Sequence, residues 1–281
     1  MIVGNGDYRY QVADGWGRGQ RTLGIATGMA TDSQDNVYII DREPAPAVVV
    51  FSRDGQLLKT WGEDTLSVPH DIWIDNEDRI YIADCGDHTA RIWSKDGEVL
   101  QTIGMPDQPG TPGTPFNRPT RIVRHPSGDL YVSDGYGQDY IHRFSDDGTL
   151  RQTWGGRGDG PGQFSLPHNI FVAPDGRVVV ADREPNNRIQ VFEPYGTFIT
   201  QWTGHPYPCG LYIDADSIVY IAEGGCVHIF TMDGHLLAYW VVTGGPHNAA
   251  HGAHGIWVDS QGDVYVGEVG VGDLYHKYIK I

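Results

Sequence analysis

Residues 72–84 read IWIDNEDRIYIAD: an apolar strand ends in aspartate, a polar turn follows, and a Tyr-Ile-Ala-Asp strand begins. Short apolar runs bounded by turn residues predict a β-hairpin. The same unit recurs five more times along the 281-residue chain. Its second strands read VYIID at 37–41, LYVSD at 130–134, VVVAD at 178–182, VYIAE at 219–223 and VYVGE at 264–268.

A third strand follows most pairs, as at residues 48–51, and a glycine turn then leads to a fourth strand that often ends near Trp-Gly. Four strands per unit and six units predict an all-β, six-bladed β-propeller. The last unit ends at Ile281 after three strands, and residues 8–17 resemble the missing fourth. We therefore expect the N-terminal strand to complete the last blade and close the ring, in one domain over residues 1–281.

The composition excludes several classes of function. Hydrophobic residues make up 40% of the chain, enough for a folded core, and the net charge is −16. A strongly acidic surface repels phosphate backbones and anionic membranes. We therefore expect neither a nucleic acid nor a membrane as partner, and the sequence makes no prediction of the oligomeric state.

The cysteines are sparse, and the N-terminus has no targeting signal. Three cysteines without regular spacing do not form a disulfide framework. Residues 1–7 contain neither a basic region nor a long apolar run, although a trimmed leader would leave the same start. A cytoplasmic location is the expectation.

One position of the inner strands, five residues before their end, differs from blade to blade. In chain order it reads Thr27, His70, Thr120, His168, Cys209 and His254. Equivalent positions on alternate blades lie about 120° apart around a six-fold axis, and inner strands line the central channel. The three imidazoles of blades two, four and six are therefore expected to converge. Three histidines with an open position are typical of a catalytic zinc.

A histidine taken by itself is more often a strand residue satisfied by a backbone hydrogen bond. Here three of the 12 histidines share one register on strictly alternate blades, which favours a metal site. We predict that His70, His168 and His254 bind Zn²⁺ or another divalent transition metal. Cys209, at the same register of blade five, is expected to be a bystander.

Fourteen residues beyond that register, every blade carries an acid. The acids are Asp41, Asp84, Asp134, Asp182, Glu223 and Glu268. Because all six blades share this feature, we expect the carboxylates to cap turn amides or to bridge blades. One or two of them could also orient the histidine rings.

The residue after this acid is Arg42 in blade one and Arg183 in blade four, which face each other across a six-bladed ring. Guanidinium binds carboxylate through two parallel hydrogen bonds, so these arginines would suit a small anionic substrate. Alternatively, each arginine pairs with its neighbouring acid, Glu43 or Glu184. On the same rim in blade three, the phenol of Tyr136 could act as an acid or a base.

At these residues the chain resembles the NHL-repeat propellers, a group that includes peptidyl-α-hydroxyglycine α-amidating lyase, and the resemblance covers nearly the whole chain. Its most specific part is LPHN at 166–169, VADRE at 180–184 and RIQVF at 188–192. YVSDGY at 131–136 resembles the block that carries the lyase's catalytic tyrosine. VPHD at 68–71 and AHG at 253–255 resemble its other two zinc-ligand motifs.

The resemblance implies a role for each candidate residue. The implied zinc ligands are His70, His168 and His254. Tyr136 would be the general base, and Arg183 would hold the substrate near its hydroxyl or carboxylate. Arg42 corresponds to the family's second arginine by blade position only.

Two positions depart from the family. The lyase has an aspartate after its last zinc histidine that helps to bind a structural calcium, whereas this chain has Gly255, so Ca²⁺ binding is left open. Asp71 offers a carboxylate elsewhere on the rim. A disulfide of the lyase starts directly after its tyrosine, where this chain has Gly137.

These observations favour a zinc-dependent lyase that cleaves the C–N bond of a small N-acyl-α-hydroxyglycine-like substrate to an amide and glyoxylate. One alternative keeps the metal and makes the protein a hydrolase of a small anionic ester, lactone or amide. Another alternative is a non-enzymatic NHL scaffold that binds other proteins.

Overall fold

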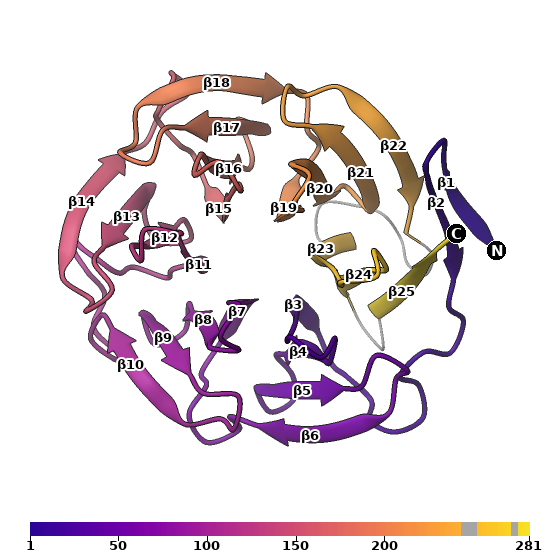
Figure 1. Cartoon of the computed structure of the whole chain (residues 1–281). Coiled ribbons are helices and arrows are strands. Elements are labelled where there is room, and N and C mark those ends of the chain that lie inside the picture. The colour runs from indigo at the N-terminus through magenta and orange to yellow at the C-terminus, as the bar shows by residue number, and fades with distance from the viewer. Residues whose placement is uncertain (243–251, 271–274) are drawn as a thin grey trace. The chain divides into compact units, whose positions relative to one another are not determined.

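The computed structural model describes residues 1–242, 252–270 and 275–281. These residues form strands, turns and loops, and no membrane-spanning helix is found among them. The chain divides into a first unit, Met1–Thr65 with Cys209–Ile281, and a second unit, Leu66–Pro208. Each unit contains three antiparallel sheets (Figure 1). The fold is therefore the predicted all-β, six-bladed β-propeller, whereas a single domain over residues 1–281 stays a prediction.

The second unit holds three four-stranded sheets, which we call blades two, three and four. Blade two comprises β7 (Pro69–Ile74), β8 (Ile80–Asp84), β9 (Thr89–Trp93) and β10 (Val99–Ile103). Blade three comprises β11 (Arg121–Arg124), β12 (Leu130–Asp134), β13 (Tyr140–Phe144) and β14 (Leu150–Gly155). Blade four comprises β15 (Pro167–Val172), β16 (Val178–Asp182), β17 (Arg188–Phe192) and β18 (Phe198–Thr203). The inner strands β7, β11 and β15 lie next to one another.

The first unit holds blades one, five and six. Blade one comprises β3 (Ala26–Thr31), β4 (Val37–Asp41), β5 (Ala47–Phe51) and β6 (Leu57–Trp61). Blade five comprises β19 (Pro208–Ile213), β20 (Ile218–Glu223), β21 (Cys226–Thr231) and β22 (Leu236–Val241). Blade six has the order β1 (Ile2–Asn5), β2 (Tyr8–Val12), β25 (Tyr275–Lys280), β24 (Val264–Val269) and β23 (Gly252–Val258).

The N-terminal strand completes blade six, as predicted. Strand β2 pairs antiparallel with β25, with Tyr10 opposite Lys280. Strand β1 adds a fifth, outermost strand that the sequence analysis does not predict. It is four residues long, and only Ile2 and Val3 are large and apolar, so it carries little of the signal by which strands are identified.

The aspartate that ends the inner strand organises the hairpin that follows it. Asp75 accepts hydrogen bonds from the backbone N–H groups of Glu77 and Arg79, both at 2.9 Å. The Tyr81 hydroxyl, at the second position of the next strand, donates to the same carboxylate at 2.9 Å. The same arrangement recurs around Asp32, Asp214 and Asp259. The repeated Asp and Tyr of the sequence are therefore partners in one turn.

The acid at the end of the second strand anchors the loop that enters the blade. Asp84 accepts hydrogen bonds from the backbone N–H groups of Ser67 and Val68 at 2.7 and 2.8 Å. Asp182 makes the same pair of contacts with the loop before β15, at 2.9 and 3.1 Å. The predicted capping of turn amides is confirmed at these two carboxylates. The anchored amides lie two and three residues before the histidine register, so the carboxylates also fix the start of the strands that carry the site.

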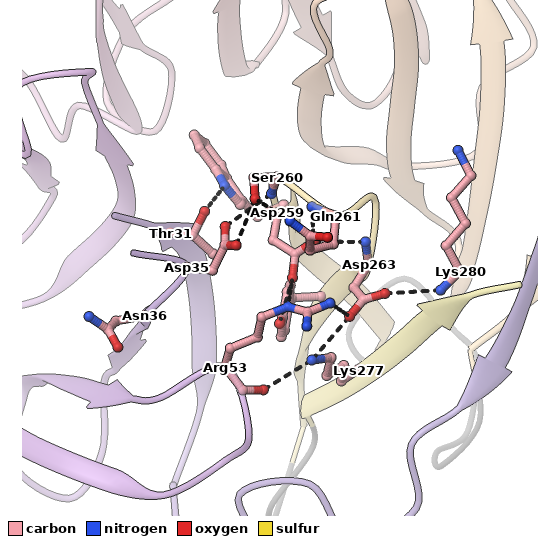
Figure 2. A network of polar contacts seen from close by, with 12 residues as sticks. Thr31, Asp35, Asn36, Arg53, Asp259, Ser260, Gln261, Asp263, Lys277 and Lys280 are labelled. Atoms are coloured by element: carbon pink, nitrogen blue, oxygen red, sulfur yellow. Dashed lines mark hydrogen bonds and ion pairs between the residues drawn. The ribbon is translucent and has the colours of Figure 1, made fainter. Parts of the chain in front are cut away.

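A polar network joins blades one and six within the first unit (Figure 2). Arg53, in the turn between β5 and β6, binds Asp259 at 3.0 Å and Asp263 at 2.6 Å. Lys277 of β25 lies 3.1 Å from the Asp263 carboxylate and donates to the backbone oxygen of Arg53 at 3.0 Å. Asp263 and Lys277 are only 2% and 5% exposed. Because burying an unpaired charge costs free energy, each of these charges is stabilised by the other.

Replacing Asp263 with alanine should destabilise the fold strongly. A buried cation that loses its carboxylate costs about 3–5 kcal/mol, and we expect a loss of that size in the free energy of unfolding measured in urea. Asp233→Ala changes an exposed turn residue and should stay within about 0.5 kcal/mol of the parent. A loss below about 1 kcal/mol for Asp263→Ala would mean that water replaces the missing partner.

Candidate metal and catalytic site

The three histidines of the predicted register occupy the same irregularity in their strands. From Pro69 to Asp71, strand β7 advances by two residues and passes His70. Its partner β8 advances by only one residue over the same distance, from Asp84 to Ala83. The same register shift occurs at His168 in β15 and at His254 in β23. A β-bulge of this kind bends the strand and redirects the extra side chain. The bulge thus sets these imidazoles apart from the alternating side chains of the sheet.

In the second unit, two histidines and the predicted tyrosine come together. The Tyr136 hydroxyl oxygen lies 3.0 Å from Nε2 of His70 and 3.1 Å from Nε2 of His168. The two imidazole rings cross nearly at right angles, with centroids 4.6 Å apart. Both histidines are fully buried, and Tyr136 is half-buried. One phenol oxygen therefore faces two ring nitrogens of separate blades.

Backbone carbonyls hold the opposite ring nitrogens. Nδ1 of His70 lies 2.7 Å from the carbonyl oxygen of Thr120, and Nδ1 of His254 lies 2.6 Å from that of Thr27. A carbonyl oxygen only accepts, so Nδ1 carries the hydrogen in both rings and a neutral ring presents the lone pair of Nε2. These threonines stand at the histidine register of blades three and one, and no role was predicted for them.

Thr120 also links the strands of the two buried histidines. Its hydroxyl donates to the backbone oxygen of Pro167, directly before His168, at 3.0 Å. The loop of Tyr136 approaches the same strand, because a Cβ on Gly135 would lie 2.3 Å from that Pro167 oxygen. Only glycine allows this approach, so Gly135 brings Tyr136 against β15.

A buried ion pair lies one residue beyond the histidine register in the second unit. The Asp71 carboxylate accepts hydrogen bonds from Nη1 of Arg121 at 2.6 Å and from Nδ2 of Asn169 at 2.7 Å. The side chains of Asp71 and Arg121 are each 1% exposed. Burial raises the pKa of the Asp71 carboxyl, and the Arg121 charge opposes that rise. The three residues directly follow the site register in β7, β11 and β15, so they tie these strands together.

The two predicted arginines lie in different units. In the second unit, Nε and Nη2 of Arg183 donate to both carboxylate oxygens of Glu184, at 2.9 and 3.0 Å. The alternative of pairing with the adjacent acid is therefore correct for Arg183 in this structure. In the first unit, Arg42 follows β4, is half-buried, and its backbone N–H donates to the oxygen of Ile25 at 3.0 Å. That the two arginines face each other stays a prediction.

One cation near the tyrosine was missed. The guanidinium of Arg118 lies over the ring of Tyr136, 5.5 Å from its centroid, and the Tyr136 backbone N–H donates to the Arg118 oxygen at 3.3 Å. Arg118 belongs to the long Pro- and Gly-rich connection before β11, outside the strand registers at which the blades were compared. The comparison of equivalent positions therefore gave no signal for it.

The remaining predicted positions are consistent with minor roles. No disulfide joins any of the three cysteines, all of which lie in the described residues, and Cys209 is a buried residue of β19. Gly255, in β23, has no room for a side chain without a shift, because a Cβ there would lie 2.8 Å from the carbonyl oxygen of Thr27. This carbonyl also accepts the hydrogen bond from His254, so glycine allows the two strands to come close.

Comparison with curated proteins identifies relatives of two kinds. Human NHL repeat-containing protein 3 is 33% identical over 208 residues, which are 69% of this chain and 59% of the relative. Peptidyl-glycine alpha-amidating monooxygenase of Mus musculus is 30% identical over 67% of this chain and 22% of the relative. Peptidyl-alpha-hydroxyglycine alpha-amidating lyase 1 of Drosophila melanogaster is 26% identical over 70% of this chain and 43% of the relative. The chain spans less than two thirds of each of these proteins.

Solved structures agree on the fold. A gluconolactonase from Xanthomonas campestris superposes with a TM-score of 0.73 at 15% identity, covering 99% of this chain and 97% of that one. A streptogramin B lyase gives a TM-score of 0.65 at 16% identity, covering 92% and 96%. The model of the NHL repeat matches residues 164–192, which include His168 and Arg183. The chain is thus a six-bladed β-propeller that carries an NHL repeat at residues 164–192 and is similar to the peptidyl-α-hydroxyglycine α-amidating lyases.

Proposed function

We propose that this protein is a metal-dependent lyase that cleaves the C–N bond of a small N-acyl-α-hydroxyglycine-like substrate, giving an amide and glyoxylate. One observation carries the proposal: the Tyr136 hydroxyl lies within 3.1 Å of the Nε2 atoms of two buried histidines. A phenol between two imidazoles is suited to proton transfer beside a cation. The sequence relatives that bear the lyase name support this reaction class.

His70, His168 and His254 would hold the metal, and Zn²⁺ suits three imidazoles best. The ligand nitrogens of His70 and His168 lie within 4.8 Å of each other. The Nδ1 hydrogen bond of His70 to a carbonyl is the outer contact that metal-binding histidines usually make. His254 has the same bulge and the same kind of Nδ1 contact, and on this equivalence we include it. When bound, the metal would supply a Lewis acid for the oxygens of the substrate.

Tyr136 would act as the general base. Its oxygen accepts the proton of the substrate hydroxyl, and the C–O bond of that carbon becomes the aldehyde carbonyl of glyoxylate. The electrons of the breaking C–N bond stay on nitrogen, which takes the proton that Tyr136 accepted and becomes the amide. Arg118 places a positive charge over the Tyr136 ring, 5.5 Å from its centroid.

Arg183 and Arg42 would bind the carboxylate of the substrate. A guanidinium fork matches a carboxylate in two hydrogen bonds, and Glu184 makes this contact with Arg183 in the structure. A substrate carboxylate would exchange with Glu184 or bind another edge of the guanidinium. Arg42 enters the proposal through its blade position alone.

We expect no structural calcium next to His254. Gly255 offers no carboxylate there, and its close approach to Thr27 leaves little room for one. The carboxylate at the same register of blade two, Asp71, already has a cation partner in Arg121. A divalent ion at Asp71 would have to displace that buried guanidinium.

The proposal is tested by metal analysis and product identification. The purified protein should contain about one zinc ion per chain and release glyoxylate from α-hydroxyhippurate. Chelation should abolish this release, and added zinc should restore it. His168→Gln should lower zinc content and activity together, whereas His235→Ala, at an exposed turn, should change neither.

The products also separate the alternatives. Full activity after chelation and in His168→Gln contradicts the metal-dependent mechanism. Zinc together with hydrolysis of an ester, lactone or amide, and without glyoxylate, supports the hydrolase. A protein with neither zinc nor activity supports a scaffold that binds other proteins. Urea unfolding of each variant shows whether a loss reflects the site or the fold.

Tyr136→Phe should separate proton transfer from metal binding. Loss of a positioned base lowers the rate by about 10²–10⁴-fold, so kcat should fall by that factor while zinc content stays at the parent level. Tyr195→Phe removes a hydroxyl from a tyrosine that is 64% exposed and should leave kcat unchanged. Parent-level kcat in Tyr136→Phe would exclude this phenol as the base.

A further inference from the structure

A pocket of about 260 Å³ opens beside Tyr136 within the second unit. It lies between the loop after β12 and the start of β15, and its lining includes Asp139, Arg157, Leu166 and Glu184. Leu166 is the one aliphatic side chain among the lining residues, and the others are polar, charged, aromatic or glycine. The volume is just below the range of about 300–1,000 Å³ typical of small-molecule sites, so the pocket suits a group of about one amino-acid residue.

The two carboxylates of the pocket, Asp139 and Glu184, differ in how closely a cation is bound to each. Asp139 is only 13% exposed at its side chain, and its one described cation partner, Arg157, is 75% exposed and 3.6 Å away. An exposed guanidinium at that distance compensates a carboxylate weakly. Burial raises the pKa of the Asp139 carboxyl, and Arg157 opposes that rise. Glu184, in contrast, is held by both forked nitrogens of Arg183.

The wall that carries Asp139 is firmly placed. The Asp139 backbone oxygen accepts a hydrogen bond from the N–H of Gly156 at 2.7 Å. A Cβ on Gly137 would lie 2.3 Å from the Asn117 side chain, so this loop is packed against the loop before β11. Tyr136, in the same loop, reaches both buried histidines. A molecule whose hydroxyl meets Tyr136 can therefore extend past Asp139.

We propose that this pocket binds the acyl part of the substrate and selects acyl groups that carry a cation, such as a lysyl side chain, over hydrocarbon chains. The inference rests on the proposed lyase function. A hydrocarbon chain would remove water from Asp139 and return no hydrogen bond, which costs free energy. An ammonium group restores the lost hydrogen bond and complements the charge.

The test compares three substrates at one pH: Nα-acetyl-lysyl-α-hydroxyglycine, N-octanoyl-α-hydroxyglycine and α-hydroxyhippurate. We expect kcat/KM for the lysyl substrate to exceed that for the octanoyl substrate by about tenfold. Asp139→Asn should lower this ratio to about threefold or less, and glyoxylate release from α-hydroxyhippurate shows whether the variant still turns over. Asp146→Asn, an exposed acid of the same blade that pairs with Arg124, is the matched control and should preserve the ratio. Preference for the octanoyl substrate, or a ratio that Asp139→Asn does not change, overturns the proposal.

Binding of the product amides separates this proposal from the proposed reaction. If none of the three substrates yields glyoxylate, the lyase function fails, but the pocket can still be tested. Nα-acetyl-lysinamide should then bind more tightly than octanamide in an NMR titration, and Asp139→Asn should remove the difference. Equal binding of the two amides overturns the inference.

Discussion

The geometry of the site depends on one hydrogen bond, from Nδ1 of a buried histidine to a threonine carbonyl at the same register of the next blade. His70 makes it to Thr120 in the second unit, and His254 makes it to Thr27 in the first. A bulge turns each of these imidazoles out of the regular ladder, and the carbonyl then fixes the ring and the hydrogen on Nδ1. The Nε2 lone pair is thereby left for chemistry. A blade without histidine contributes as much to the orientation of the ring as the blade with it.

The anchoring carboxylates explain how a repeat of short strands holds such a geometry. Asp84 and Asp182 accept two consecutive backbone amides each, directly before the strands that carry His70 and His168. The acid and the histidine belong to different strands of one sheet, and the acid anchors the loop that leads into the histidine strand. All six blades carry the acid, whereas three carry the histidine. The shared acid is therefore a feature of every blade, whereas the histidines distinguish three of the blades at one register.

The sequence predicted the blades because the Asp and Tyr of each hairpin are bound to each other and recur together. Tyr136 was predicted on the rim as an acid or a base, and its contacts with His70 and His168 are seen only in the structure. The sequence could not predict the role of Thr120, because a backbone carbonyl has no side-chain signature. Arg118 was missed for another reason: it lies in a loop before β11, outside the strand registers that repeat from blade to blade. The fork between Arg183 and Glu184 was weighed as an alternative, and only coordinates could decide it.

The residue that follows the histidine register differs between the two units of the chain. In the first unit this register is Gly28, Gly210 and Gly255, and in the second it is Asp71, Arg121 and Asn169. Glycine is required where backbones touch, since a Cβ on Gly210 would lie 2.3 Å from the His254 oxygen. Where the strands leave room, a buried ion pair occupies the space. Such a pair adds little net stability, because desolvation offsets its attraction. The ion pair does fix the distances between the strands. Because Asp71 of β7 is bound to β11 and β15, it limits how far His70 can move from His168.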